Sequence, residues 1–324
     1  MKSSKIFILH QFVPFDANPD EMDVLLQANE IGAALQMSGY STEALPVAGD
    51  ISFLKKLKKA AKVVFNLVET LNGSAVNSHL VPSILEQNKI KYTGNSPDAV
   101  FVTTDKTLTK EILKTNGIPT PGWYSKEKSD HFEPGNYIFK PVAEDASIGI
   151  TEESIKTVTT AQGAAKLISQ FENRYKMDYF CEKFVEGREF NVSIIGNKGK
   201  PEVLTPAEML FLKSGIENNI LCYDSKWNEE SGKYKNSARS FGFQESDREL
   251  LELLKRYSRD CWSVFGLSGY ARVDFRVDRN NRPFVIEINA NPCLSPDGGF
   301  FAAAQNEGMN YQEMINRILA EAQL

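Results

Sequence analysis

The sequence predicts an α/β protein that begins with a parallel-sheet domain and continues into a part of α+β character. Short apolar segments alternate with helical segments over residues 1–95, as in a parallel sheet with helices on its faces. Farther along the chain, a long amphipathic helix at residues 246–266 precedes an apolar hairpin. The 324 residues suffice for two or three domains. We place these domains at residues 1–95, 96–185 and 186–324.

The N-terminal domain is expected to contain four strands and two helices. Acidic residues in the first turn and Gly39 after the last turn delimit the first helix. Ligands of parallel sheets bind at the carboxyl ends of the strands, which here fall near His10–Gln11 and Glu69–Ser74. The expected strands are residues 5–10, 41–47, 62–70 and 90–94, and the expected helices are residues 20–38 and 79–88.

The following segments predict a capped helix and several strands. Thr104 or Asp105 is expected to cap a helix that ends near Asn116-Gly117. An apolar strand ends at Lys140 before a loop of small residues, and two further strands flank the turn VEGR. A second turn is expected at NKGK, residues 197–200.

The composition excludes several classes of function. A net charge of −5 gives no electrostatic case for a nucleic-acid partner, and the basic run Lys55–Lys62 is expected on a solvated helix face. Four widely spaced cysteines and three histidines indicate neither a disulfide framework nor a zinc site. Since no apolar run reaches the length of a membrane span, we expect a cytoplasmic protein without a membrane partner.

The segment ARVDFRVDRNNRPFVIEINANP, residues 271–292, predicts a hairpin with a charged face. The period of two places Arg272 and Asp274 opposite an apolar face, and the turn is expected at Asn280-Asn281. Pairing about this turn sets Asp274 opposite Glu287, with Arg272 opposite Asn289. On the second strand we expect two faces: Phe284, Ile286, Ile288 and Ala290 on the apolar side, and Val285, Glu287 and Asn289 on the polar side.

Two directly opposed carboxylates destabilise a sheet unless they share a proton or a cation. Carboxylate and amide oxygens suit a hard ion such as Mg²⁺. The alternative is a solvated sheet face on which Arg272 and Arg276 balance the acids. The spacing alone leaves both interpretations open.

Four segments in this order resemble the ATP-grasp superfamily, and within it the D-alanine–D-alanine ligase family. They are TTDKTLTKEIL, YIFKPVAEDASIGI, CEKFVEGREF and RVDF…VIEINANPCLSP, and the resemblance covers residues 95–324. It implies an ATP-grasp fold behind an N-terminal Rossmann-like domain. It also implies an ADP-forming ligase that joins a carboxylate to an amine through an acylphosphate.

The resemblance implies a nucleotide site. Lys106 and Lys140 correspond to lysines that reach ATP phosphates, Glu182 to the acceptor of the adenine amino group, and Glu189 to the acceptor of the ribose hydroxyls. Phe184, Val185 and Ile286 complete the cofactor-binding set as residues that line the nucleotide.

The resemblance also implies the metal and catalytic groups. Asp274, Glu287 and Asn289 correspond to Mg²⁺ ligands, with two ions expected and Mn²⁺ as a substitute. Arg272 corresponds to the residue that stabilises the transferring group. Ser147 of the phosphate loop and Lys226 complete the expected catalytic set.

The residues that would face the substrates depart from the family pattern. The family has H-G-x-x-G-E-D-G where this chain reads NLVETLNGSAVNS, and Ala146 and Trp227 replace a serine and a tyrosine. Asp297 lies where an acid would repel a carboxylate. We therefore expect small-molecule carboxylate and amine substrates, an amino acid or small peptide among them, and an acceptor whose carboxylate is absent, masked or distant. Glu69 and His10–Gln11 are expected to replace the missing acid.

Three alternatives stay open. The first is D-alanine–D-alanine ligase itself with a divergent site, and the second is an ATP-grasp kinase that phosphorylates a hydroxyl. The third is a nucleotide-binding protein without catalysis, against which the intact Arg272, Asp274, Glu287 and Asn289 argue. A homodimer is left open as a partner.

Overall fold

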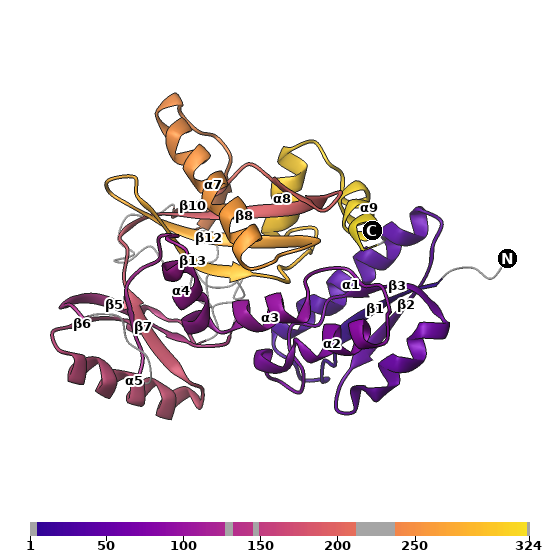
Figure 1. Ribbon diagram of the computed structural model, residues 1–324, viewed down its shortest axis with the longest axis horizontal. Helices are drawn as coiled ribbons and strands as arrows, with labels where there is room; N and C mark the ends of the chain where they lie inside the picture. The colour runs from indigo at the N-terminus through magenta and orange to yellow at the C-terminus, as the bar shows by residue number, and fades with distance from the viewer. Residues whose placement is uncertain (1–4, 127–131, 145–148, 212–236, 323–324) are drawn as a thin grey trace.

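The computed structural model describes residues 5–126, 132–144, 149–211 and 237–322, which form three sheets with helices packed on them (Figure 1). The N-terminal sheet lies at one end of the molecule. The other two sheets and their helices make up the rest. Each sheet falls within one of the three ranges expected for the domains, and the exact boundaries stay a prediction.

The N-terminal sheet is parallel, as predicted, and has the order β2-β1-β3. Its strands are β1 (Lys5–Gln11), β2 (Ser41–Val47) and β3 (Ala61–Asn66). The strand expected at residues 90–94 is reduced to a single parallel bridge between Val64 and Tyr92. Helices α1 (Pro19–Met37) and α2 (Leu80–Gln87) also match the expectation.

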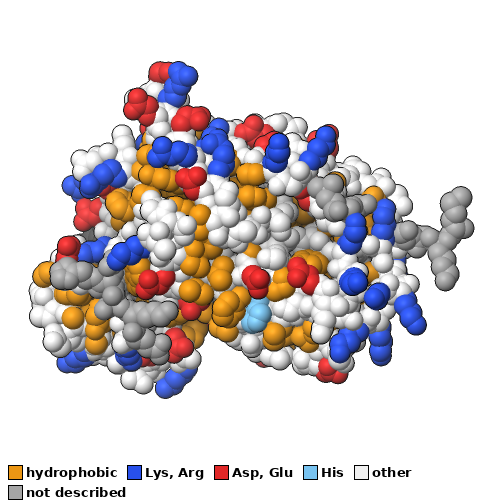
Figure 2. All heavy atoms as spheres, in the orientation of Figure 1, with side chains coloured by type: hydrophobic (Ala, Val, Ile, Leu, Met, Phe, Trp, Pro, Cys, Tyr) orange, Lys and Arg blue, Asp and Glu red, His pale blue; other side chains and the backbone are white. Residues whose placement is uncertain are grey.

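The start of α1 and the basic run each have a local cause. Asn18 and Glu21 form a capping box, in which the Asn18 backbone N–H donates to the Glu21 carboxylate. The run that was expected on a helix face lies mostly in a 3₁₀-helix, η1 (Ile51–Lys59), whose lysines are exposed while Leu54 and Leu57 are buried. Figure 2 shows Lys and Arg side chains gathered over this end of the molecule.

The four-stranded sheet is antiparallel and has the order β4-β7-β5-β6. Helix α5 (Ala161–Tyr175) covers one of its faces through an aromatic core that includes Phe139 and Phe171. The period of two then places Ile138, Lys140 and Glu182 on the opposite face. The strands are β4 (Trp123–Tyr124), β5 (Gly135–Pro141), β6 (Ile155–Val158) and β7 (Tyr179–Lys183).

The six-stranded sheet carries the predicted hairpin at β12 and β13. Its apolar face packs against α7 (Arg248–Val264), α3 (Pro97–Thr104) and α4 (Lys106–Thr115). Asp105 caps α4 by accepting from the Thr107 and Leu108 N–H groups, which agrees with the predicted cap. The strands are β8 (Gly187–Asn197), β9 (Lys200–Val203), β10 (Ala207–Phe211), β11 (Ser237–Ser240), β12 (Tyr270–Asp278) and β13 (Pro283–Asn289).

The N-terminal sheet and the C-terminal helices share one core. Helices α8 (Gly299–Asn306) and α9 (Tyr311–Glu321) pack their apolar side chains with those of α1 and β1. Asn95 adds a polar connection, because its buried amide donates to the Tyr270 and Ala290 carbonyls at 2.7 Å and 2.6 Å. These contacts hold the N-terminal sheet against the base of the hairpin.

The hairpin confirms the predicted register and corrects the predicted faces. Asp274 pairs with Glu287 and Arg272 with Asn289, as expected. A β-bulge then leaves Ile286 without a partner, so that Val285 pairs with Phe275. The assignment of Val285 to the polar face and of Phe284 and Ile286 to the apolar face was therefore wrong: Val285 is in the core, Phe284 pairs with Arg276 of the polar face, and Phe284 and Ile286 are only partly buried.

The end of the hairpin differs in detail from the expected turn. The Asn281 N–H donates to the Asp278 carbonyl, so Arg279 and Asn280 are the central residues of the turn. Asn281 follows in the left-handed region, with φ 56°. This combination is the common three-residue hairpin loop.

Candidate active site

The candidate site is built on two polar sheet faces. Arg272, Asp274 and Arg276 lie on the face of β12 that α7 does not cover. Lys140 and Glu182 lie on the face of the four-stranded sheet that α5 does not cover. Helix α4 reaches both faces, since the ion pairs of Lys106 and of Lys110 end on different sheets. The two faces therefore meet at α4.

Asp274 is held by a cation and an amide. Arg272 donates to both oxygens of its carboxylate, with Nε–Oδ1 at 2.7 Å and Nη2–Oδ2 at 2.8 Å, and Asn289 Nδ2 donates to Oδ2 at 3.2 Å. Burial lowers the pKa of Arg272, but Asp274 and Glu287 outweigh burial and raise it above its usual range. Asn191 of β8 pairs with Asp274 in register, which extends the polar row to a third strand.

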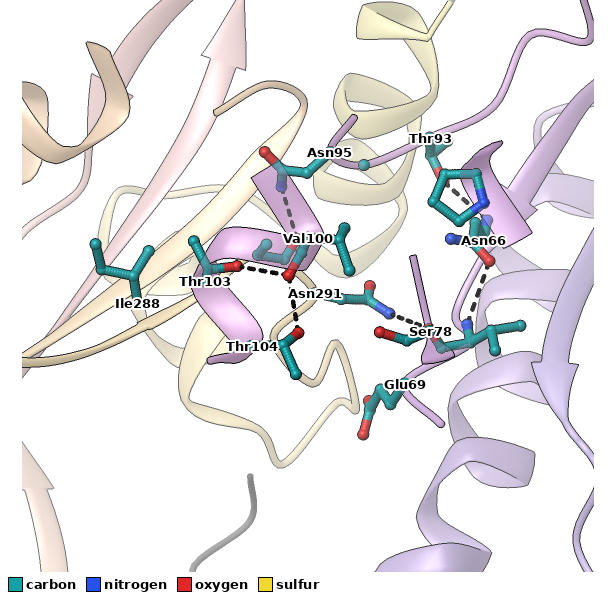
Figure 3. A pocket seen from close by; sticks show the side chains of 14 residues that line it. Asn66, Glu69, Ser78, Thr93, Asn95, Val100, Thr103, Thr104, Ile288 and Asn291 are labelled. Carbon is teal, nitrogen blue, oxygen red and sulfur yellow. Dashed lines mark hydrogen bonds between the residues drawn. The ribbon is translucent and has the colours of Figure 1, made fainter. Parts of the chain in front are cut away.

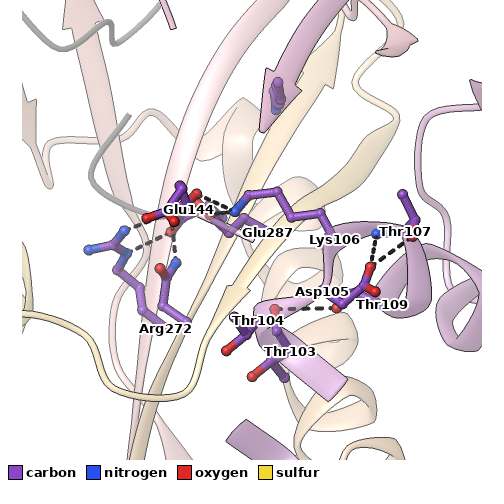
Figure 4. A network of polar contacts seen from close by, with 12 residues as sticks. Thr103, Thr104, Asp105, Lys106, Thr107, Thr109, Glu144, Arg272 and Glu287 are labelled. Carbon is purple, nitrogen blue, oxygen red and sulfur yellow. Dashed lines mark hydrogen bonds and ion pairs between the residues drawn. The ribbon is translucent and has the colours of Figure 1, made fainter. Parts of the chain in front are cut away.

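Glu287 is held by Lys106. The Lys106 Nζ atom lies 3.0 Å from Glu287 Oε1 and donates to the Glu144 carbonyl at 2.6 Å (Figure 4). The Lys106 N–H also donates to the Val142 carbonyl. The lysine at the start of α4 thus connects the hairpin with the first residues of the phosphate loop expected after Lys140.

The hairpin fits a divalent cation by its donor types. Asp274, Glu287 and Asn289 offer carboxylate and amide oxygens on one face, which are the ligands that a hard cation prefers. In the described part of the chain, no three His, Cys, Asp or Glu side chains cluster as a metal site. A cation at the hairpin would therefore depend on Asn289 and on oxygens of a bound phosphate.

Glu182 is buried between two lysines. Lys140 Nζ lies 2.5 Å from its Oε1 atom, and Lys110 forms an ion pair with Oε2. Burial raises the pKa of Glu182, but the two ammonium groups outweigh it and hold the pKa below its ordinary value. The predicted adenine acceptor therefore carries a full negative charge that is already balanced.

Lys110 was not found by sequence reasoning. Its Nζ atom also donates to the Thr120 hydroxyl at 2.9 Å, and this hydroxyl donates to the Val285 carbonyl at 2.8 Å. The chain of contacts connects Glu182 of the four-stranded sheet with β13. The signal in the sequence was the spacing of four from Lys106, which places both lysines on one side of a helix.

Arg276 holds the connector between β7 and β8, residues 184–186. This arginine lies 3.1 Å from Glu189 through Nη1, donates from Nε to the Val185 carbonyl at 3.0 Å, and covers the Phe184 ring at 5.3 Å. The three expected nucleotide residues Phe184, Val185 and Glu189 therefore meet at one buried guanidinium. Sequence reasoning considered Arg276 only as a balancing charge.

A second group of side chains connects α1 with the loop after β13. Asp23 accepts from Gln27 Nε2 at 2.9 Å, from the Ser295 hydroxyl at 2.7 Å and from the Cys293 thiol at 3.2 Å. Burial and the Asp23 charge raise the pKa of Cys293 to about 12. No local signal marked the contacts of Asp23 with Cys293 and Ser295, because these partners are about 270 residues away in the sequence.

The carboxyl end of β3 and the residues after it line a small pocket between the N-terminal sheet, α3 and the hairpin, at the kind of sheet edge where ligands of parallel sheets bind. The pocket has a volume of about 30 Å³, and Asn66, Ser78, Thr104 and Asn291 lie around it with Glu69 at its edge (Figure 3). This space holds one or two water molecules, so a substrate would lie at its mouth.

The side chains expected to replace the missing acid have different surroundings. The Glu69 N–H donates to Gln11 Oε1 at 3.3 Å, which joins the ends of the two strands. His10 is buried, which lowers its pKa, and its Nδ1 lies 2.8 Å from the Gln11 carbonyl. Among the expected replacements, Glu69 is thus the residue that lines the pocket.

The neighbourhood of Asp297 contains a cation that the sequence did not indicate. Arg239 of β11 donates from Nη1 to the Asp297 carbonyl at 3.0 Å, while the Asp297 residue is exposed. A Cβ atom on Gly299 would lie 3.2 Å from Arg239 Nε, so the glycine admits the guanidinium close to the start of α8. A guanidinium therefore lies next to the backbone of the loop that carries the exposed Asp297.

Four expected positions lie outside the described residues. They are Ser147 and Lys226 of the catalytic set, and Ala146 and Trp227 among the departures from the family pattern.

Comparisons with known proteins identify the class. The model of the family described as D-ala D-ala ligase C-terminus matches residues 113–320. An uncharacterised protein of Sinorhizobium fredii, y4sG, is 31% identical over 90% of this chain and 86% of its own length. A D-alanine–D-alanine ligase of Marinomonas is 28% identical over 93% and 92%.

Solved structures show the same fold. The ATP complex of D-alanine–D-alanine ligase from Bacillus anthracis has a TM-score of 0.72 at 21% identity and covers 99% of this chain and 97% of its own. D-alanyl-alanine synthetase A from Vibrio cholerae has a TM-score of 0.75 at 17% identity, with full coverage of both chains (100% and 100%).

The match to the family model and the arrangement of the sheets identify an ATP-grasp protein, as the sequence predicted. More particularly, the chain belongs to the D-alanine–D-alanine ligase family of ADP-forming ligases, which use ATP to form a carbon–nitrogen bond. Such ATP-dependent ligases require a divalent metal ion. Among the residues that the structure describes, no helix is long and apolar enough to cross a membrane.

Proposed function

We propose that this protein joins a carboxylate to an amine of an amino acid or small peptide, with ATP bound between the two polar sheet faces. The observation that carries the proposal is the row of Asp274, Glu287 and Asn289 beside Lys106 and Arg272. It combines acids for a metal with cations for phosphate oxygens. Such a set neutralises charge during phosphoryl transfer.

The nucleotide is proposed to lie along the connector and the β5–β7 sheet. Phe184 and Val185, with the partly buried Ile286, line the adenine. Glu189 accepts from the ribose hydroxyls, and Lys106 and Lys140 reach the phosphates. Glu182 is proposed to accept from the adenine amino group, and Lys110 and Lys140 keep its carboxylate charged.

The metal is proposed to be Mg²⁺, with two ions held by Asp274, Glu287 and Asn289 and with Mn²⁺ as a substitute. When bound, the metal neutralises charge between the β- and γ-phosphates. Lys106 and Arg272 balance Glu287 and Asp274 in the structure. These two cations become available to phosphate oxygens when another cation balances the acids.

The reaction is proposed to begin with attack of the substrate carboxylate on the γ-phosphate. An amine then attacks the acylphosphate, releases phosphate and leaves an amide. Arg272 stabilises the charge of the transferring group, with Ser147 and Lys226 as further catalytic residues. Since the groups act by position and charge, catalysis requires the two sheets to hold both substrates in place.

The substrates are proposed to include an ammonium group near the mouth of the small pocket between the N-terminal sheet, α3 and the hairpin. Glu69 lies at its edge, and Asp23 accepts hydrogen bonds from Cys293 and Ser295 in the loop that follows β13. On the acceptor side, Arg239 beside Asp297 weakens the argument that an acid excludes a carboxylate. A D-alanine acceptor is therefore the alternative to be tested, and the hypothesis of a masked or distant carboxylate stays a proposal.

A screen of amino-acid pairs with ATP and Mg²⁺ tests the proposed function. A ligase releases ADP and phosphate and yields an amide by mass spectrometry, and phosphate release requires both substrates. The alternative kinase yields ADP and a stable phosphoester without free phosphate. A phosphoester product would replace the ligase by the kinase.

We further propose a cytoplasmic homodimer. Val76, Leu80 and Phe101 are exposed, and His79 lies against the Phe101 ring at 5.2 Å. Figure 2 shows apolar side chains gathered on this face over α3. Sedimentation of the wild type and of Phe101→Asp tests the proposal, and a monomeric wild type would contradict it.

A further inference from the structure

Arg276 of β12 lies where the connector between β7 and β8, residues 184–186, joins the six-stranded sheet. Its guanidinium contacts Glu189, the Val185 carbonyl and the face of Phe184. We infer that Arg276 is a positioning residue for nucleotide selection: it orients Glu189 toward the ribose and fixes the connector against β12. The inference rests on the proposed nucleotide site, and it assigns a role to a residue outside the expected site.

The three contacts require an arginine. A guanidinium presents several N–H donors in one plane and a flat face to an aromatic ring, whereas an ammonium is a point charge without such a plane. Arg276 uses Nη1 for Glu189 and Nε for Val185, while its face covers Phe184. A lysine retains the charge but cannot hold all three groups in one geometry.

The ion pair between Arg276 and Glu189 is buried, and it sets the orientation of the Glu189 carboxylate. Arg276 is 5% exposed and Glu189 is 8% exposed, and the two residues are directly paired on β12 and β8. A buried charge is costly without its partner. The contact of Arg276 with Oε2 therefore fixes the Glu189 carboxylate and sets the direction of Oε1, its second acceptor oxygen.

The connector backbone is fixed at the neighbouring position of β12. A Cβ atom on Gly187 would lie 2.0 Å from the Val277 carbonyl oxygen, and Gly187 has a φ of 145°. Only glycine admits this approach. Arg276 thus holds the connector and Val277 holds the first residue of β8, which leaves Glu189 little freedom to adapt to another sugar.

The test measures binding of ATP and of 2′-deoxy-ATP to Arg276→Met, together with KM and kcat for ATP. Methionine keeps an apolar stem of similar length and removes the guanidinium. We expect the dissociation constant for ATP to rise roughly tenfold to a hundredfold, as for a lost hydrogen bond to a charged group. The preference for ATP over 2′-deoxy-ATP should fall by a similar factor, and kcat should change less than KM.

Two further variants separate positioning from general stability. Arg276→Lys keeps the charge, so we expect it to restore folding and only part of the ribose preference. Arg279→Met removes an exposed arginine that pairs with Glu186 of the same connector, and we expect no change in either measurement. If Arg276→Met is poorly folded by thermal unfolding, Arg276→Lys decides the question.

The outcomes distinguish the inference from the proposed function. An unchanged ribose preference in folded Arg276→Met and Arg276→Lys would overturn the role of Arg276 while leaving the nucleotide site in place. A wild type that binds ATP and 2′-deoxy-ATP equally, or binds neither, would overturn the assignment of Glu189 and the inference together. We expect Arg276→Met and Glu189→Gln to lose the same part of the preference for ATP over 2′-deoxy-ATP. The double variant should lose no more than either single variant.

Discussion

Asp274 and Glu287 lie directly opposite each other on β12 and β13, and each carboxylate is balanced by its own cation. Arg272 contacts Asp274 from the same strand, and Lys106 contacts Glu287 from the start of α4. The like charges that would destabilise a bare hairpin are therefore compensated in the structure. The same two cations lie where the proposed phosphates would bind.

Glu287→Gln should reduce turnover by about a hundredfold or more, because a charge that holds the proposed metal is lost. The fold should persist, since an amide fits the same space and Lys106 also contacts the Glu144 carbonyl. Phosphate release at limiting Mg²⁺ is the measurement. Glu245→Gln, which changes an exposed residue, is the control and should behave as the wild type. Unchanged turnover in Glu287→Gln would remove the metal assignment.

Glu182→Ala should lower the free energy of unfolding by about 3–5 kcal/mol, because Lys110 and Lys140 lose the partner of a buried ion network. Urea unfolding checks this value, and Glu153→Ala at an exposed ion pair is the control that should leave the free energy of unfolding almost unchanged. In the folded fraction, KM for ATP should rise and the preference for ATP over GTP should narrow. If the preference for ATP over GTP is unchanged, Glu182 has only a structural role.

The stability of the protein should fall in acid partly through Glu182. Its pKa in the folded state lies below the ordinary 4.5, because the two lysines outweigh burial. The unfolded state then binds the proton first, so this contribution is present above about pH 4.5 and is lost as the pH falls toward the folded pKa. Unfolding midpoints between pH 3 and 7 should show a weaker acid dependence in Glu182→Gln. Identical slopes would show that other groups govern acid unfolding.

Cys293 should react slowly with iodoacetamide at pH 7–8. Burial and Asp23 raise the pKa of its thiol to about 12, so little reactive thiolate is present. Asp23→Asn should speed the reaction, because it removes the negative charge that opposes the thiolate. Mass spectrometry of the labelled peptide gives the rate, with the same peptide in urea as the fully accessible reference. Fast labelling of the native wild type would contradict the described environment.

D-Alanine as sole substrate, with ATP and Mg²⁺, should give slow formation of D-alanyl-D-alanine. The hypothesis depends on the changed residues near the acceptor, Asp297 among them. Arg239→Ala provides the matched comparison, since this guanidinium lies beside the same loop. Rapid dipeptide formation with a KM unaffected by Asp297→Ser would restore the alternative of D-alanine–D-alanine ligase.

Local pattern was sufficient for the elements and for the hairpin register. Alternating polarity places Asp274 opposite Glu287, because a slip by one residue would move charged side chains into the core. The cap at Asp105 and the strands around residues 185–188 were also readable, since each depends on neighbours in the sequence. The bulge at Ile286 could not be predicted, because the alternation of period two continues through it in the sequence. The pairing of Val285 with Phe275 is what reveals the extra residue.

The family, the hairpin that carries the acids and the residues proposed for the nucleotide could all be predicted from the sequence. Which charges balance one another became evident from the packed structure alone. Lys110 with Glu182, Arg276 with Glu189, and Asp23 with Cys293 join segments far apart in the chain. A buried charge takes its partner from whichever element packs against it, and the order of residues along the chain does not contain that packing.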